Sequence, residues 1–207
     1  MPKGLPADVP ELAGKLSRLG AVGRFRNPSL WDALAIAVIR QVIRAGQAAV
    51  LYRAFCAAYG GRVDLGDEEV ALFPSPEIVL GLTDRQFTSV GMAFKRRPLR
   101  AVAEAYLKYS SQWQHLSPAA LVRELQRVSH VGAWTAGAAV ADWSNDFALY
   151  PYADLAVRTW AGRAAPSYPW PVDEVGFGQL WRRIAGDHLS SLTLLTLAWG
   201  KHHGDNP

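Results

Sequence analysis

The segment from Leu121 to Trp160 places the strongest constraint on how this chain can fold. It contains a short apolar-periodic run, a tight His130-Val131-Gly132 turn, small residues from Ala136 to Ala141, and a carboxylate at Asp154. A helix that breaks at a turn and restarts at once presents unpaired backbone amides at its new N-terminus, where a phosphate can bind. Small residues let a neighbouring helix or a nucleic-acid backbone approach closely. The segment therefore predicts two helices joined by an anion-binding turn.

Asp154 stands at the N-cap position of a periodic run that begins at Leu155 and continues through Val157 to Trp160. An aspartate at this position is most often a cap that accepts hydrogen bonds from backbone amides. A fixed carboxylate among apolar neighbours can also stabilise positive charge that develops during a reaction. Taken alone, the residue favours the capping role.

These motifs together resemble the helix-hairpin-helix DNA glycosylases, particularly the branch similar to bacterial 3-methyladenine DNA glycosylase II. The family's hairpin, G-I-G-x-W-T-A, corresponds to His130–Ala136, and Asp154 lies 22 residues beyond Gly132, where the resemblance places the catalytic aspartate. The pairs Trp31-Asp32 and Gln41-Val42 also match family motifs, as does the Phe-Pro-Ser-Pro-Glu run at 73–77. The resemblance extends over roughly residues 27 to 200 and favours a catalytic role for Asp154.

The resemblance implies an enzyme that flips a damaged base out of duplex DNA and hydrolyses its N-glycosidic bond. Family members that also cleave the strand carry a lysine two residues after the second hairpin glycine, where this chain has Trp134. The implied enzyme is therefore monofunctional, leaves an abasic site, and acts on alkylated purines such as 3-methyladenine or 7-methylguanine. The implied site comprises Asp154 as the catalytic residue, Trp134 and Trp31 in the base pocket, and Gln41, Val42, His130, Val131, Gly132, Ala133 and Thr135 in contact with DNA.

Several of these residues have other interpretations. Val42 is the residue that, by resemblance, fills the gap left by the flipped base, but β-branched residues are usually buried in a core. Gln41 contacts DNA bases or caps a helix, and Trp134 stacks on the base or packs internally. His130 replaces the first hairpin glycine and adopts a positive φ less readily. The basic run Lys95-Arg96-Arg97, with Arg100, contacts phosphates or is an ordinary solvated helix start.

Helical periodicity and N-cap signals recur along the chain, with no alternating strand pattern, which predicts an all-α fold. The helix-start signals include Asn27-Pro28-Ser29, the run at 73–77, a capping box at Thr83–Gln86 and Ser117-Pro118. We expect residues 1–207 to form one glycosylase domain of two helical lobes, with core motifs over about 30–115 and 116–160. The N- and C-terminal helices should pack together, and an N-terminal β domain is not expected. Residues 62–69 form a polar connector that we expect to be a loop.

Composition limits the alternatives. The chain has 207 residues, half of them hydrophobic, and a net charge of +4, which weakly favours an anionic partner. Its single cysteine, Cys56, excludes an intrachain disulfide and a cysteine-ligated metal site, and His202-His203 lack partner ligands at usable spacing. We expect a cytoplasmic, nucleoid-associated monomer without a membrane segment. The expected partner is double-stranded DNA with damaged bases.

No cofactor is expected, apart from a monovalent cation that the resemblance allows at the hairpin. The competing hypothesis from another class is a non-catalytic helix-hairpin-helix protein that recognises distorted DNA. Such a protein would have no need of Asp154.

Overall fold

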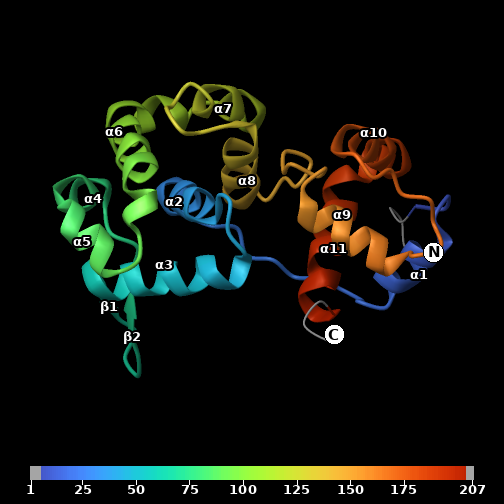
Figure 1. The fold of residues 1–207 in the computed structure, drawn as a ribbon, viewed down its shortest axis with the longest axis horizontal. Helices are drawn as coiled ribbons and strands as arrows, with labels where there is room; N and C mark the ends of the chain where they lie inside the picture. Colours follow the sequence, from blue (N-terminus) through green and yellow to red (C-terminus); the bar gives the residue numbers. More distant parts are fainter. Residues whose placement is uncertain (1–5, 204–207) are drawn as a thin grey trace. The chain divides into compact units, whose positions relative to one another are not determined.

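The computed structural model describes residues 6–203 and divides into two compact units. Within this range, unit 1 contains residues 6–26 and 145–203, and unit 2 contains residues 27–144 (Figure 1). Both units are built almost wholly of helices, so the predicted all-α class is confirmed. The hairpin turn and Gln41-Val42 lie in unit 2, whereas Asp154 lies in unit 1.

The first helix of unit 2 is capped by Ser29, whose hydroxyl accepts a hydrogen bond from the Asp32 amide. Serine and threonine side chains likewise cap the helices that follow Ser75, Thr83 and Ser117, as N-cap preferences predict. Its helices are α2 (Leu30–Arg40), α3 (Ala45–Tyr59), α4 (Pro76–Gly81), α5 (Asp84–Ser89), the 3-10 turn η1 (Ala93–Lys95), α6 (Arg96–Trp113), α7 (Pro118–Leu125) and α8 (Ala133–Ser144).

The most extensive helix–helix packing in unit 2 is between α2 and α8. Every residue of α8 from Thr135 to Ala141 is buried, and most are alanine or glycine, so the two helix backbones can approach closely. Leu34 and Val38 of α2 are fully buried in the same unit. This packing connects the end of α2 to the beginning of α8, where the two turns of interest lie.

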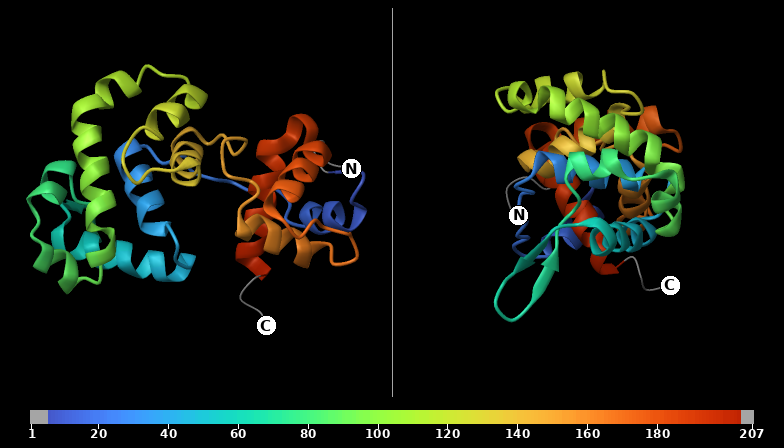
Figure 2. Two further views of the ribbon diagram at one scale, coloured as in Figure 1. Left: turned by 45° about the horizontal axis from the view of Figure 1, so that its top comes forward. Right: turned by 90° about the vertical axis from the view of Figure 1, so that its left-hand side faces the viewer.

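The predicted loop at residues 62–69 is wrong, because this region contains a two-stranded antiparallel hairpin. Strands β1 (Arg62–Asp64) and β2 (Glu69–Ala71) pair with Val63 opposite Val70 and protrude from unit 2 (Figure 2). Gly66 has a φ of +92° in the connecting turn, a conformation that glycine adopts without strain. Each strand carries a valine between its first and third residues, which is the alternation expected of a strand. The acidic residues in this segment led to the loop prediction.

Unit 1 contains α1 (Pro10–Ser17), α9 (Leu155–Ala164), α10 (Glu174–Ala185), the 3-10 turn η2 (Gly186–His188) and α11 (Leu189–His203). Helix α11 packs against α9, α1 and α10. Gly200 faces the indole ring of Trp160 so closely that any Cβ at this position would overlap the ring. None of the helices within residues 6–203 is long and apolar enough to cross a membrane.

Candidate active site

The hairpin turn retains the backbone conformation for which glycine is usually required. His130, which replaces the first glycine of the motif, has a φ of +67°, in the left-handed region. Gly132 has no positive φ, and a Cβ built on it would meet nothing within 4 Å. His130, Gly132 and Ala133 are exposed, whereas Val131 is buried and anchors the turn. The first amides of α8, which lack intrahelical acceptors, are therefore reached over small exposed residues.

Val42 projects into solvent from a strained backbone. Helix α2 ends at Arg40, and Val42 follows the C-cap Gln41 with a φ of +63°. Its side chain is fully exposed, at 103% of its reference area, so the alternative of core packing is wrong. A β-branched residue in the left-handed region is a conformational outlier that costs on the order of 1–2 kcal/mol. Such strain persists only where surrounding contacts enforce it.

Gln41 connects the Val42 turn to the hairpin turn. Its Nε2 donates to the His130 carbonyl oxygen at 3.0 Å and to the Thr135 hydroxyl at 2.8 Å, across 89 and 94 residues of sequence. Both hydrogens of the amide are thereby used, and Thr135 is 3% exposed. Gln41 therefore fixes the two turns relative to each other, and the Thr135 side chain serves this link. Only the Thr135 backbone amide remains a candidate for DNA contact.

Lys95 supports the same turn from inside the unit. The residue is 3% exposed, and its Nζ donates a 2.6 Å hydrogen bond to the backbone carbonyl of Gln41. Removal from water lowers the pKa of the Lys95 ammonium to about 8. The phosphate-contact interpretation of the basic run is therefore wrong for Lys95, which is buried and occupied.

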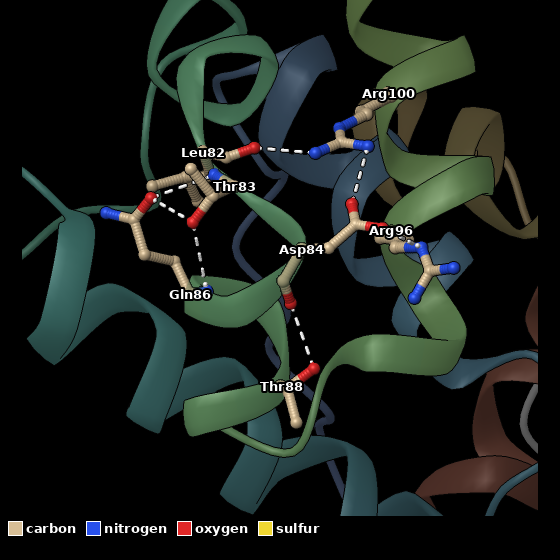
Figure 3. A network of polar contacts seen from close by, with 7 residues as sticks. All are labelled: Leu82, Thr83, Asp84, Gln86, Thr88, Arg96 and Arg100. Carbon is tan, nitrogen blue, oxygen red and sulfur yellow. Dashed lines mark hydrogen bonds and ion pairs between the residues drawn. The ribbon is translucent and has the colours of Figure 1, made fainter.

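Two further cations of that run are held within the protein. Arg96 and Arg100 both pair with the Asp84 carboxylate, at 3.3 and 3.0 Å, and Arg100 also donates to the Leu82 carbonyl (Figure 3). A capping box between Thr83 and Gln86 fixes the start of α5, on which Asp84 lies. This network attaches the first turn of α6 to α5. Within the basic run, only Arg97 is exposed.

The two tryptophans predicted for a base pocket have different surroundings. Trp134 is partly exposed, and the Arg40 guanidinium lies over its ring at 5.7 Å from the centroid. Trp31 is only 6% exposed, its Nε1 donates to the Pro74 carbonyl, and its ring packs against Phe73. Trp31 is therefore part of the aromatic core of unit 2, and we leave it out of the proposed pocket.

Asp154 occupies the N-cap position of α9, but its side chain makes no capping hydrogen bond. Instead, Oδ2 accepts a 2.8 Å hydrogen bond from the Tyr150 hydroxyl. The Tyr150 ring is buried and stacks on Phe147, whose amide donates to the Ser190 hydroxyl. The carboxylate is thus oriented by a tyrosine that the sequence analysis missed. The only available signal was the spacing of four residues between the two positions.

No group of three or more histidine, cysteine, aspartate or glutamate side chains within residues 6–203 could hold a metal ion. His202 and His203 are exposed at the end of α11.

Comparison with known proteins relates this arrangement to solved structures. No family model and no curated protein sequence matches the chain. A 3-methyladenine DNA glycosylase from Archaeoglobus fulgidus superposes with a TM-score of 0.78 at 18% identity, covering 94% of this chain and 67% of that one.

Two further structures show the same likeness. An 8-oxoguanine glycosylase/lyase from Clostridium acetobutylicum was solved with double-stranded DNA containing cytosine opposite 8-oxoguanine. It superposes with a TM-score of 0.77 at 13% identity, and the match covers 96% of this chain and 68% of that one. A DNA-3-methyladenine glycosidase from Bacillus halodurans superposes with a TM-score of 0.67 at 16% identity, and the match covers 96% of this chain and 88% of that one. The chain therefore has the fold of the helix-hairpin-helix DNA glycosylases.

Proposed function

We propose that this protein is a monofunctional DNA glycosylase that hydrolytically releases alkylated purine bases from double-stranded DNA. The observation that carries the proposal is the state of Asp154. Its carboxylate stands at a helix N-terminus without capping it, and it is oriented through one oxygen by Tyr150. A carboxylate that served only as a cap would use its oxygens on the helix amides. A non-catalytic DNA-binding protein would have no use for this arrangement.

Hydrolysis of the N-glycosidic bond requires one negative charge close to the sugar. Loss of the base leaves oxocarbenium character on the sugar, and a fixed carboxylate stabilises that charge as it develops. Asp154 fits this role and can orient the attacking water. An alkylated purine is already cationic and leaves readily, so a second carboxylic acid is unnecessary.

DNA binding is assigned to the two turns that Gln41 connects. The exposed amides at the start of α8 suit phosphate oxygens, as helix N-termini generally do. Val42 is exposed and apolar, and its side chain can fill the gap that an extruded base leaves in the stack. Contacts of this kind recognise the DNA backbone and its distortion without reading the base sequence.

The absence of strand cleavage rests on the residues present in unit 2. Trp134 occupies the position of the family's Schiff-base lysine. Lys95 has a lowered pKa, a property that nucleophilic lysines share, but its amine is buried and hydrogen-bonded to Gln41. The lysine with the lowered pKa is therefore not placed for attack on a sugar.

Alkylpurines are the finer part of the proposal, since the similar solved structures include both 3-methyladenine and 8-oxoguanine enzymes. A cationic, electron-poor ring gains about 0.5–2 kcal/mol from an aromatic face, and Trp134 offers one.

A monovalent cation at the hairpin remains a prediction. The turn between Val128 and Ala133 contains no carboxylate, so its backbone carbonyl oxygens are the ligands that it would offer. Neutral oxygen ligands of this kind suit a weakly held cation of low charge. No step of the proposed reaction depends on it.

The decisive experiment incubates the protein with genomic DNA treated with a methylating agent and identifies the released free bases by mass spectrometry. The Asp154→Asn protein, checked for folding by circular dichroism, serves as the control. We expect release of 3-methyladenine or 7-methylguanine by the wild type only. Release of uracil or hypoxanthine without alkylpurine would contradict the substrate assignment, and release of no base would favour the non-catalytic alternative.

A further inference from the structure

The backbone at Val42 is strained and its side chain touches nothing, so other contacts must hold it in place. The side chain is fully exposed and the residue has a φ of +63°. A left-handed valine relaxes unless its neighbours over-determine the conformation. The contacts that hold the peptide group before Val42 involve Gln41.

The carbonyl oxygen of Gln41 belongs to the planar peptide group that joins Gln41 to Val42. Fixing the direction of this carbonyl therefore fixes the plane from which Val42 leaves the chain. The Lys95 ammonium holds this oxygen at 2.6 Å, while the Gln41 side chain is held by His130 and Thr135. The peptide plane and the side chain of Gln41 are thus fixed by two separate elements, the plane by η1 and the side chain by the hairpin.

Burying a lysine without a carboxylate partner is unfavourable, so its position calls for an explanation. Lys95 is 3% exposed and takes part in no ion pair within residues 6–203. Its described contacts are the Gln41 carbonyl and the Phe94 ring, 5.1 Å from Nζ. A Lys→Met change would bury the same stem without the desolvation of a charge. The gain that the amine brings is the charge-assisted hydrogen bond to Gln41.

The base of the Lys95 side chain is itself fixed. Lys95 directly precedes α6, and the next residue, Arg96, pairs with Asp84 in the network that attaches α6 to α5 (Figure 3). The amine is therefore presented to Gln41 from a rigid junction. A continuous set of contacts runs from α5 through Lys95 and Gln41 to the turn that carries Val42.

We propose that Lys95 is a positioning residue for Val42, which holds the Gln41–Val42 peptide so that the valine side chain stays poised to enter the gap left by an extruded base. The proposal rests on the DNA-binding part of the proposed function. It assigns Lys95 no contact with DNA and no part in the chemistry.

The test measures binding separately from base release. The dissociation constant is measured for a duplex with one tetrahydrofuran abasic analogue and for the matched intact duplex, and the ratio reports filling of the gap. A 2-aminopurine opposite the analogue reports the local insertion by its fluorescence. We expect Lys95→Met to reduce the preference for the abasic duplex about tenfold, the effect of losing one charge-assisted hydrogen bond, and to reduce the fluorescence change. Binding to the intact duplex should be unaffected.

Lys108→Met is the matched control, because it makes the same chemical change at an exposed position of α6. It should leave the ratio and the fluorescence at wild-type values. A folded Lys95→Met protein that keeps both wild-type values overturns the proposal. If Lys95→Met does not fold, Lys95→Gln removes the same ammonium with a polar side chain that is one atom shorter, and a wild-type ratio in that variant overturns the proposal equally.

Base release distinguishes this inference from the proposed activity. A wild-type protein that prefers the abasic duplex but releases no base contradicts the proposed activity alone. The Lys95→Met ratio still decides the positioning role in that case.

Discussion

The Tyr150 hydroxyl donates to Asp154 Oδ2 at 2.8 Å, from a tyrosine ring that is itself buried and stacked on Phe147. This hydrogen bond directs one carboxylate oxygen away from the amides of α9. An N-cap side chain typically stabilises its helix by about 1 kcal/mol, and Asp154 does not make that contribution. The arrangement is understandable if the orientation of the carboxylate matters more than helix stability.

Replacing Tyr150 by phenylalanine should slow base release about tenfold, because Asp154 loses the hydrogen bond that orients it. Tyr152→Phe is the matched control, since its hydroxyl makes no hydrogen bond within residues 6–203. Single-turnover release from a methylated duplex is the measurement. Equal rates for wild type and Tyr150→Phe would show that the hydrogen bond does not serve the reaction.

Replacing Asp154 by asparagine should reduce the release rate by on the order of 100- to 1000-fold, because the amide keeps the shape of the side chain and loses its charge. The fold and the affinity for duplex DNA should be retained, as measured by circular dichroism and fluorescence anisotropy. If the asparagine variant releases the base at the wild-type rate, Asp154 has no catalytic function.

Replacing Val42 by glycine should separate stability from DNA distortion. Glycine relieves about 1–2 kcal/mol of left-handed strain, and its greater freedom in the unfolded chain costs about 0.4–1 kcal/mol, so the free energy of unfolding should rise slightly or stay unchanged. Selective binding of an abasic duplex should fall. Val38→Ala, at a fully buried position of α2, should instead lose about 2 kcal/mol of stability. A Val42→Gly protein as destabilised as Val38→Ala in urea titrations would contradict this account.

How far the sequence could predict this structure depended on the range of the interactions concerned. Local signals placed the helices correctly at Ser29, Ser75, Thr83 and Ser117, because a cap acts within its own first turn. The Gln41 link spans 89 residues of sequence, and no local pattern encodes such a contact.

The misjudged residues share this physical cause. Lys95 lies in a run of charges, which favours a surface position, whereas its burial depends on the carbonyl that it meets across 54 residues. Val42 is likewise β-branched, which favours a buried position, whereas it is fully exposed next to Gln41, whose contacts reach across 89 residues. The fold class and Asp154 could thus be singled out from the sequence, whereas the contacts between the two turns required the structure.

The stability of the wild-type protein should rise between pH 8 and pH 10.5 relative to Lys95→Met. Burial lowers the pKa of Lys95 to about 8 from its ordinary 10.5, so in this range the unfolded chain keeps a proton that the folded protein has released. Since the unfolded state then binds more protons, the free energy of unfolding increases with pH, by up to about 3 kcal/mol. Urea titrations of both proteins at pH 7.5, 9 and 10.5 measure the difference. Parallel pH curves would show that Lys95 does not titrate in this range.

The contact between Arg40 and Trp134 makes a prediction about the choice of base. The guanidinium lies 5.7 Å from the centroid of the indole ring, so it competes with a cationic purine for the negative potential of that ring. Arg40→Gln should therefore raise the release of cationic 7-methylguanine relative to neutral hypoxanthine by about 2- to 5-fold, corresponding to a cation–π contribution of about 0.5–1 kcal/mol. Using the ratio of two bases in one variant cancels the uniform loss of phosphate attraction that removing an arginine brings.

In a Trp134→Ala background, the Arg40→Gln change should leave the ratio unaltered. A shift of the ratio toward hypoxanthine would show that Arg40 assists cationic bases in some other way and that Trp134 is not their stacking surface.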